Sequence, residues 1–226
     1  MNKYHFISPL PLQIFLRTLL WPLYRIFFRH RVQGLEHLKK IEGNFIIASN
    51  HIHELDAVTI PVVIPVKDFL KPFFFVSLSK KYYLNRGLRA RLFYGGFFFK
   101  LVGGYEAYKG VNDFNTSLQN HVRILKNGGV VCIFPEGYIG KPGDEKEAKG
   151  GVAFLAHTTR LPIVPIRLEG LWGVSLKDFI KEKKRLKIVI GEPLHYKDLF
   201  VENHSYSYEE YKGIAQKILD IIKKIN

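Results

Sequence analysis

The fold of this chain is decided by residues 45–56, which read Phe45-Ile46-Ile47-Ala48-Ser49-Asn50-His51-Ile52-His53-Glu54-Leu55-Asp56. The apolar run that opens this stretch, residues 45–48, is short enough to be a buried strand. A polar turn follows it directly. Because α/β proteins keep their functional sites at the rim of a sheet, where strands end in turns, we expect the side chains of this turn to lie at such a site.

Two kinds of histidine–carboxylate pair are possible in this turn. An imidazole takes and returns a proton near neutral pH, and a carboxylate can fix its tautomer. His51 and Asp56 are five residues apart, about 140° around a regular helix, so they meet only if the chain turns between them. His53 and Asp56 are three apart and would share a helix face, as would His51 and Glu54. The alternative is that these residues serve only as turn residues and helix caps.

The length of 226 residues indicates one domain, or one domain with an appendage, and a hydrophobic content of 47% is enough for a core. The single cysteine, Cys132, excludes an internal disulfide framework and a metal cluster of thiolates. Cys132 lies in an apolar run, so we interpret it as a core residue.

The net charge of +14 predicts a negatively charged partner. Residues 67–100 combine basic and aromatic side chains, which suits either a groove for single-stranded nucleic acid or a membrane interface. No nucleic-acid-binding motif is visible. We therefore expect an anionic membrane surface as partner and no nucleic acid. A binding protein without enzymatic activity is an alternative, but it leaves the ordered motifs described below unexplained.

The N-terminal part is the most apolar of the chain, at residues 10–29. Two arginines interrupt it, so it is a poor transmembrane span. Its polar residues are multiples of four apart and form one narrow stripe: Gln13, Arg17, Arg25 and Arg29. This pattern predicts a helix lying in a membrane interface, kinked or broken near Pro22; the alternative is a helix packed on the domain. We thus expect an amphipathic membrane-associated segment at 1–32 and the main domain at 33–226.

Strands alternate with helices along the rest of the chain, which predicts an α/β fold. The predicted strands are 45–48, 72–78, a short one within 103–110, 130–134, 162–168 and 186–190. The predicted helices are 112–126, one ending near residue 159, and a last one that starts after a capping box of Ser207 with Glu210. Residues 88–101 are ambiguous between helix and strand. If Pro162 and Pro165 have no functional role, the interpretation of these prolines is a strand at an edge of the sheet.

Four motifs follow one another at distinctive separations. They are Asn50-His51 with Asp56, the segment 104–110 with Lys109, Phe134-Pro135-Glu136-Gly137, and Leu161-Pro162-Ile163-Val164-Pro165-Ile166. Together they resemble the glycerolipid acyltransferase family, whose best-known members are the lysophosphatidic acid acyltransferases. The resemblance covers roughly residues 20 to 195.

The resemblance implies an α/β sheet flanked by helices and an ester-forming reaction that needs no cofactor and no metal. A fatty acyl thioester, on coenzyme A or acyl carrier protein, is attacked by a hydroxyl of a lysophospholipid such as 1-acylglycerol-3-phosphate. By position, His51 would be the general base and Asp56 the acid that orients it. The implied substrate-binding residues are Asn50, Lys109, Glu136, Gly137 and Lys149. The implied location is the membrane surface on the cytoplasmic face.

Two departures from the family pattern leave the acceptor open. Many relatives continue the Phe-Pro-Glu-Gly motif with Thr-Arg-Ser, whereas this chain continues with Tyr138-Ile139-Gly140. Lys109 stands where an arginine is usual, and it lacks the bidentate fork of a guanidinium. Either Lys149 or Lys141 compensates, or the acceptor is a lyso-aminolipid or a glycolipid.

A metallohydrolase is the alternative from a different class. The run His51-Ile52-His53 followed by Asp56 resembles the His-x-His-x-Asp-His run of the metallo-β-lactamase fold. The aspartate is one position late, however, and Ala57 stands where the last histidine should be. A hydrolytic metal site also needs ligands from other loops, and the candidates are His157, His195 and His204.

Overall fold

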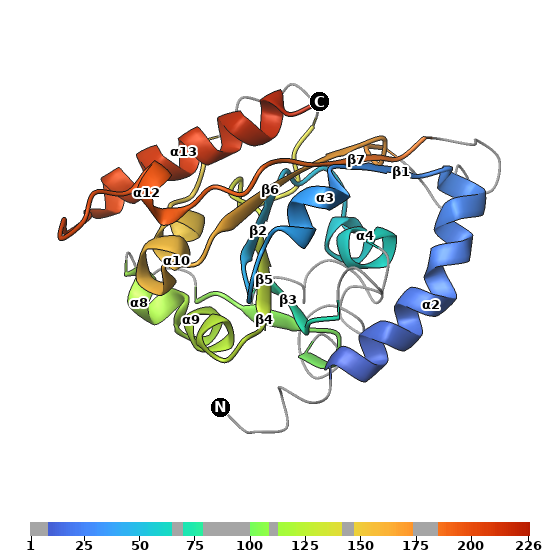
Figure 1. Cartoon of the computed structure of the whole chain (residues 1–226), viewed down its shortest axis with the longest axis horizontal. Coiled ribbons are helices and arrows are strands. Elements are labelled where there is room, and N and C mark those ends of the chain that lie inside the picture. Colours follow the sequence, from blue (N-terminus) through green and yellow to red (C-terminus); the bar gives the residue numbers. More distant parts are fainter. Residues whose placement is uncertain (1–8, 65–69, 79–99, 109–112, 142–146, 174–184) are drawn as a thin grey trace.

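The structure is a computed structural model, and it describes residues 9–64, 70–78, 100–108, 113–141, 147–173 and 185–226. Within these residues the chain forms a seven-stranded sheet with helices on both faces (Figure 1). The strands are β1 (Arg31–Gln33), β2 (Ile46–Ser49), β3 (Phe73–Ser77), β4 (Gly104–Glu106), β5 (Val130–Ile133), β6 (Ile163–Glu169) and β7 (Lys187–Ile190). The predicted α/β fold is confirmed.

Strand β2 lies in the middle of the sheet, whose order is β1-β7-β6-β2-β5-β3-β4. Neighbouring strands are parallel except β6 and β7. Ile47 of β2 is in register with Cys132 of β5 and with Val164 of β6. A strand buried on both faces reads as a continuous apolar run, as residues 45–48 do. Because β2, β5 and β6 are parallel, the turns that follow them meet at one edge of the sheet.

Alternation along the strands divides the core between the two faces. Ile47 packs in one cluster with Leu38 and Ile60, whereas Ile46 packs in the other with Ile124. The first face is covered by α2 (Pro9–Phe28), α3 (Leu35–Lys39) and α4 (Asp56–Val63). The second face is covered by α8 (Phe114–Ser117), α9 (Gln119–Lys126), α10 (Gly151–Thr159), α12 (Tyr196–Leu199) and α13 (Tyr208–Lys224).

Helix α2 runs along one side of the domain (Figure 1) and continues through Pro22, so of the kink or break expected there the break does not occur. The polar side chains in the first half of the helix face the domain. Gln13 and Arg17 are buried, whereas Arg25 lies on the surface. Gln13 and Arg17 therefore face the domain, as in the alternative of a helix packed on it, and only part of the polar stripe lies on the surface. No helix in the described part of the chain is both long enough and apolar enough to cross a bilayer.

The predicted helix at 112–126 is in fact two short helices, α8 and α9, that meet at Leu118. The side chain of Asp113 caps α8 by accepting from the backbone N–H groups of Asn115 and Thr116. The Ser117 hydroxyl then donates to the Tyr108 carbonyl oxygen at 2.7 Å. This bond ties the end of α8 to the segment after β4, and the chain turns at Leu118 before it continues as α9.

The expectation of an edge strand at Pro165 is also wrong, because β6 lies between β2 and β7. The Pro165 carbonyl accepts from Gly191, so the side of Pro165 that lacks an N–H faces a residue one past the end of β7. Its missing N–H therefore falls where the β7 ladder has ended. The other predicted strands and the capping box of α13 are confirmed. Most of the ambiguous segment 88–101 and of the basic and aromatic window 67–100 lies outside the described residues.

Candidate active site

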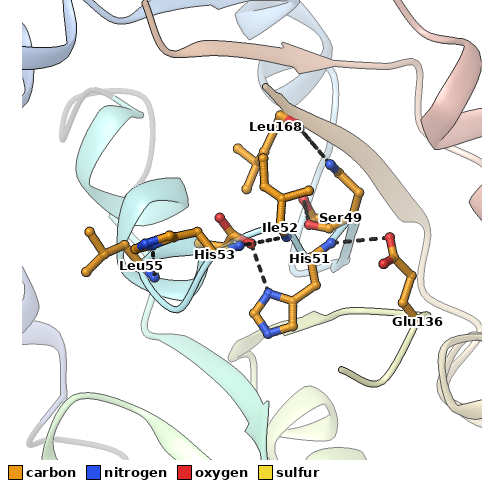
Figure 2. Close-up of polar contacts among 9 residues, drawn as sticks. Ser49, His51, Ile52, His53, Leu55, Glu136 and Leu168 are labelled. Atoms are coloured by element: carbon orange, nitrogen blue, oxygen red, sulfur yellow. Dashed lines mark hydrogen bonds and ion pairs between the residues drawn. The ribbon is translucent and has the colours of Figure 1, made fainter. Parts of the chain in front are cut away.

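Asn50 fixes the point where the chain leaves β2. Its side-chain Nδ2 donates to the Leu168 carbonyl at 2.9 Å, and its Oδ1 accepts from the Leu168 N–H at 2.7 Å (Figure 2). The amide thereby extends the pairing of β2 with β6 past Ser49, the last paired residue of β2. Asn50 was expected to bind substrate, and the structure places its amide on the backbone of β6.

His51 and Asp56 form the pair that the sequence left open. The His51 Nδ1 lies 2.9 Å from Asp56 Oδ2 (Figure 2). The two meet because the chain turns between them and α4 begins at Asp56. The same Oδ2 accepts from the N–H groups of Ile52 at 2.7 Å and of His53 at 2.8 Å. The His53 Nδ1 instead accepts from the backbone N–H of Leu55 at 3.1 Å.

The surroundings of this pair set the direction of proton transfer. The Asp56 side chain is fully buried, whereas the His51 side chain is 17% exposed. An ionised Asp56 that accepts from Nδ1 assigns the proton to that nitrogen and leaves Nε2 unprotonated. Among the described residues, none forms a hydrogen bond with His51 Nε2. The imidazole can therefore accept a proton from a substrate hydroxyl, and the carboxylate can stabilise the imidazolium that forms.

Cys132, the single cysteine, lies in the middle of β5 and is fully buried. Burial raises the pKa of its thiol far above the ordinary value, and the negative charge of Asp56 raises it further. A thiol attacks as the thiolate, which this site disfavours. Cys132 is therefore a core residue, as the sequence indicated, and it is not placed to be a nucleophile.

The turn after β5 contacts His51 directly. Phe134 stacks on the imidazole, with 4.1 Å between ring centroids and 15° between the planes. Glu136 is almost fully buried, and its Oε1 accepts from the backbone N–H of His51 at 3.3 Å (Figure 2). The Gly140 N–H donates to the His51 carbonyl at 3.0 Å. The sequence predicted Glu136 as a site residue but not Phe134. The signal that could have identified Phe134 is its position directly after a strand, as the first residue of the Phe-Pro-Glu-Gly motif.

Gly137 and Lys149 lie side by side at the same turn. Gly137 has a φ of 73°, which favours glycine, and a Cβ at this position would meet the Lys149 Cγ at 3.1 Å. The Lys149 N–H donates to the Pro135 carbonyl at 2.7 Å, which holds the start of α10 against the turn. The exposed Lys149 thus stands beside this turn. Lys109, the other predicted basic residue, lies outside the described residues.

The histidines suggested as additional metal ligands lie elsewhere in the fold. His157 bonds to the Tyr211 hydroxyl at 2.7 Å, His195 caps α12, and His204 pairs with Glu210 at 2.8 Å. The structure therefore does not bring them to His51. In the part of the chain that the structure describes, no group of three or more histidine, cysteine, aspartate or glutamate residues could hold a metal ion.

Comparison with known proteins identifies the family of the chain. The family model described as Acyltransferase matches residues 29–169. The 1-acyl-sn-glycerol-3-phosphate acyltransferase of Bacillus subtilis (strain 168) is 27% identical over 196 residues, covering 86% of this chain and 87% of that enzyme. The chloroplastic 1-acyl-sn-glycerol-3-phosphate acyltransferase of Arabidopsis thaliana is 25% identical over 202 residues, covering 85% of this chain and 49% of that protein.

The fold is also similar to that of a solved structure. The crystal structure of the 1-acyl-sn-glycerophosphate acyltransferase from Thermotoga maritima matches with a TM-score of 0.59 and 18% identity, over 94% of this chain and 80% of that one. At this identity the likeness supports the fold alone, whereas the family model spans more than half of the chain. The chain therefore belongs to the Acyltransferase family and is an enzyme of the glycerolipid acyltransferase group.

Proposed function

We propose that this enzyme transfers a fatty acyl group from a thioester, on coenzyme A or acyl carrier protein, to the free hydroxyl of a lysophospholipid. The favoured acceptor is 1-acylglycerol-3-phosphate, because the relatives from Bacillus subtilis and Arabidopsis thaliana carry that acceptor in their names. The observation that carries the proposal is the pair of His51 and Asp56, with a buried acid and an imidazole whose Nε2 can accept a proton.

The proposed reaction is a direct transfer. His51 Nε2 takes the proton of the acceptor hydroxyl while its oxygen attacks the thioester carbonyl carbon. An ester C–O bond forms, the C–S bond breaks, and the carrier leaves as a thiolate that takes the proton back from the imidazolium. Asp56 holds the ring and balances its charge during the transfer. No covalent enzyme intermediate is needed, in keeping with the protonated, buried Cys132.

The acceptor is proposed to bind along the turn after β5. The sequence suggested five residues for this site, namely Asn50, Lys109, Glu136, Gly137 and Lys149. Lys149 is the described member best suited to a phosphate, because it is exposed, positively charged and adjacent to Gly137. A lysine acts as a point charge rather than as a fork, so a phosphodiester, a lyso-aminolipid or a glycolipid remains a testable alternative to a phosphomonoester.

The outward face of α2 is proposed to lie in the membrane interface. Phe15 and Ile26 are each 63% exposed and Leu19 is 56% exposed, while the polar Gln13 and Arg17 face the domain. A water-exposed apolar face of this kind suits the acyl region of a bilayer. Drawing the acceptor into water would cost about 0.8 kcal/mol per exposed methylene, and an interfacial enzyme avoids most of that cost.

Trp21 and Arg25 on the same helix support this placement. The Arg25 guanidinium lies 5.5 Å from the centroid of the Trp21 ring system, and both side chains are exposed. Trp and Arg are typical of the headgroup level of a bilayer. The net charge of +14 favours the anionic cytoplasmic leaflet. We keep the division into a membrane segment at 1–32 and a catalytic domain at 33–226, although the boundary falls inside β1.

The proposal is tested by incubating the full-length protein with labelled acyl-coenzyme A or acyl-acyl carrier protein and a panel of lysolipids. The panel contains 1-acylglycerol-3-phosphate, a lysophosphodiester, a lyso-aminolipid and a lysoglycolipid. We expect mass spectrometry to identify the diacyl product of 1-acylglycerol-3-phosphate. Transfer to the lyso-aminolipid or the glycolipid alone would reassign the acceptor, and transfer to none of the four with either donor would refute the proposed reaction.

A further inference from the structure

The backbone of the turn that carries His51 is held by two carboxylates. The N–H of His51 donates to Glu136 Oε1, and the N–H groups of Ile52 and His53 donate to Asp56 Oδ2. Three successive N–H groups are thus bound by acids that are 7% and 0% exposed. On the other side, the His51 carbonyl accepts from Gly140. The main chain of His51 is therefore clamped by the segment that begins at Phe134.

The imidazole itself is held on two sides. Asp56 fixes Nδ1 at 2.9 Å, and this single bond still allows the ring plane to tilt about it. Phe134 removes that freedom by lying parallel to the ring at 4.1 Å. Phe134 is only 8% exposed, and its carbonyl accepts from Gly137 at 3.0 Å, so it is a fixed surface. The direction of His51 Nε2 is therefore set by Asp56 and Phe134 together.

We infer that Glu136 and Phe134 are positioning residues for the His51 base, rather than ligands of the acceptor. The inference rests on the proposed function, and it gives Glu136 a different role from the one suggested by the family resemblance. Glu136 holds the main chain of His51, and Phe134 holds its ring. Both act on substrate through His51, so their loss should lower kcat and leave the KM for acceptor unchanged.

The test uses two pairs of variants. Glu136→Ala removes the acceptor oxygen, whereas Glu136→Gln keeps an oxygen that can accept from His51. Phe134→Leu removes the aromatic face, whereas Phe134→Tyr keeps it. We expect kcat to fall about 10- to 100-fold in Glu136→Ala and Phe134→Leu, since small misplacement of a catalytic group can cost that much. The KM for acceptor should not change, and the Gln and Tyr variants should retain most of the activity.

Glu202→Gln is the matched control for the loss of an acidic side chain. Glu202 pairs with Arg160 at the surface, outside the site described above, so its substitution should leave both constants unchanged. If Phe134→Leu does not fold, Phe134→Met replaces it as the variant without a ring. A raised KM for acceptor with normal kcat in Glu136→Ala would make Glu136 an acceptor ligand and overturn the inference.

A second measurement does not depend on turnover. In protein labelled with ¹⁵N-histidine, long-range proton–nitrogen spectra report the tautomer of each imidazole. We expect the Nδ1–H tautomer for His51 in the wild type and in every Phe134 variant, because Asp56 sets it. Exchange broadening of the ring resonances should appear only in the variant without a ring, because the imidazole can tilt there. Sharp ring resonances and unchanged kcat in that variant would refute the positioning role of Phe134. Absence of acyl transfer in the wild type would refute the proposed function instead, and the spectra would still test the positioning.

Discussion

The buried guanidinium of Arg17 donates from Nη2 to the carbonyl oxygen of Ile64 at 2.8 Å. Ile64 is the C-cap of α4, the helix that begins at Asp56. A positive charge at the C-terminus of a helix is favourable because the carbonyl groups there carry partial negative charge. Burial lowers the pKa of Arg17 to about 10, so the group remains charged at neutral pH. The N-terminal helix is thereby joined to the helix that begins at Asp56.

Arg17→Met tests this contact. The substitution keeps an apolar stem of similar length and removes the donor to the Ile64 carbonyl, so we expect the free energy of unfolding to fall by about 1–3 kcal/mol. Arg25→Met is the matched control on the same helix, because Arg25 is exposed, and it should change stability by less than about 0.5 kcal/mol. Denaturant titration of both variants measures the difference. Equal stability of the two variants would show that the Arg17 contact contributes nothing.

The apolar outer face of α2 is tested with point substitutions, because deleting residues 1–29 would also remove Gln13, which binds the backbone of Phe73. The variant Phe15→Ser, Leu19→Ser, Ile26→Ser should sediment at least about tenfold less with anionic vesicles, because each buried side chain of this size contributes about 1.5–3 kcal/mol. High salt should weaken the binding of the wild type only in part, because apolar burial persists when charge is screened.

The control for this variant is Val201→Ser. Val201 is 69% exposed and follows α12, on the other face of the sheet from α2. Its substitution should leave vesicle binding unchanged. Wild-type binding by the triple variant, with the fold intact by circular dichroism, would show that the membrane surface lies elsewhere on the molecule.

The burial of His121 leads us to expect a loss of stability in mild acid. It is fully buried, and desolvation lowers its pKa to about 4 from an ordinary value near 6.5. Below pH 6.5 the unfolded chain therefore binds a proton that the native state does not, so this residue lowers stability as pH falls from 6.5 to 4. The loss reaches about 3 kcal/mol at pH 4 and is absent above pH 6.5.

His121→Gln isolates that effect. The amide can still donate to the Tyr105 carbonyl, which the His121 Nε2 contacts at 3.2 Å. The pKa values of His30 and His157 are also lowered, chiefly by burial, but both residues are unchanged in the variant. We expect the stability difference between the wild type and the variant to vary with pH between 4 and 6.5 and to stay constant above it. Parallel stability curves over that range would contradict the assignment to His121.

Most of the sheet could be predicted from the sequence because its central strands are buried on both faces. Runs such as residues 45–48 and 130–134 are apolar throughout, and the parallel pairing buries both sides of each. Residue 165 shows the limit of that reasoning. A proline indicates an edge strand only if the neighbouring strand extends far enough to need its N–H. Here β7 ends at Ile190, opposite Ile166, so no neighbouring strand lies opposite Pro165 on that side.

Most residues of the candidate site could be proposed from the sequence, but their contacts could not. The histidines and carboxylates could be recognised as neighbours in one turn, but the pairing of His51 with Asp56 depended on where α4 begins. The contact of Phe134 with His51 joins segments more than 80 residues apart, and only the parallel register of β2 and β5 brings them together. The burial of Gln13 and Arg17 could not be predicted, because helical spacing identifies a polar stripe but not the direction in which it faces.

The measurement that tests the central claim most directly compares His51→Ala with His53→Ala in acyl transfer to the acceptor that the panel identifies. Both variants are first checked for an unchanged fold. Loss of the base should lower kcat about 10²- to 10⁴-fold in His51→Ala. His53→Ala should lose far less, because the His53 ring contacts the backbone of its own turn. Equal losses in the two variants would contradict the assignment of His51 as the base held by Asp56.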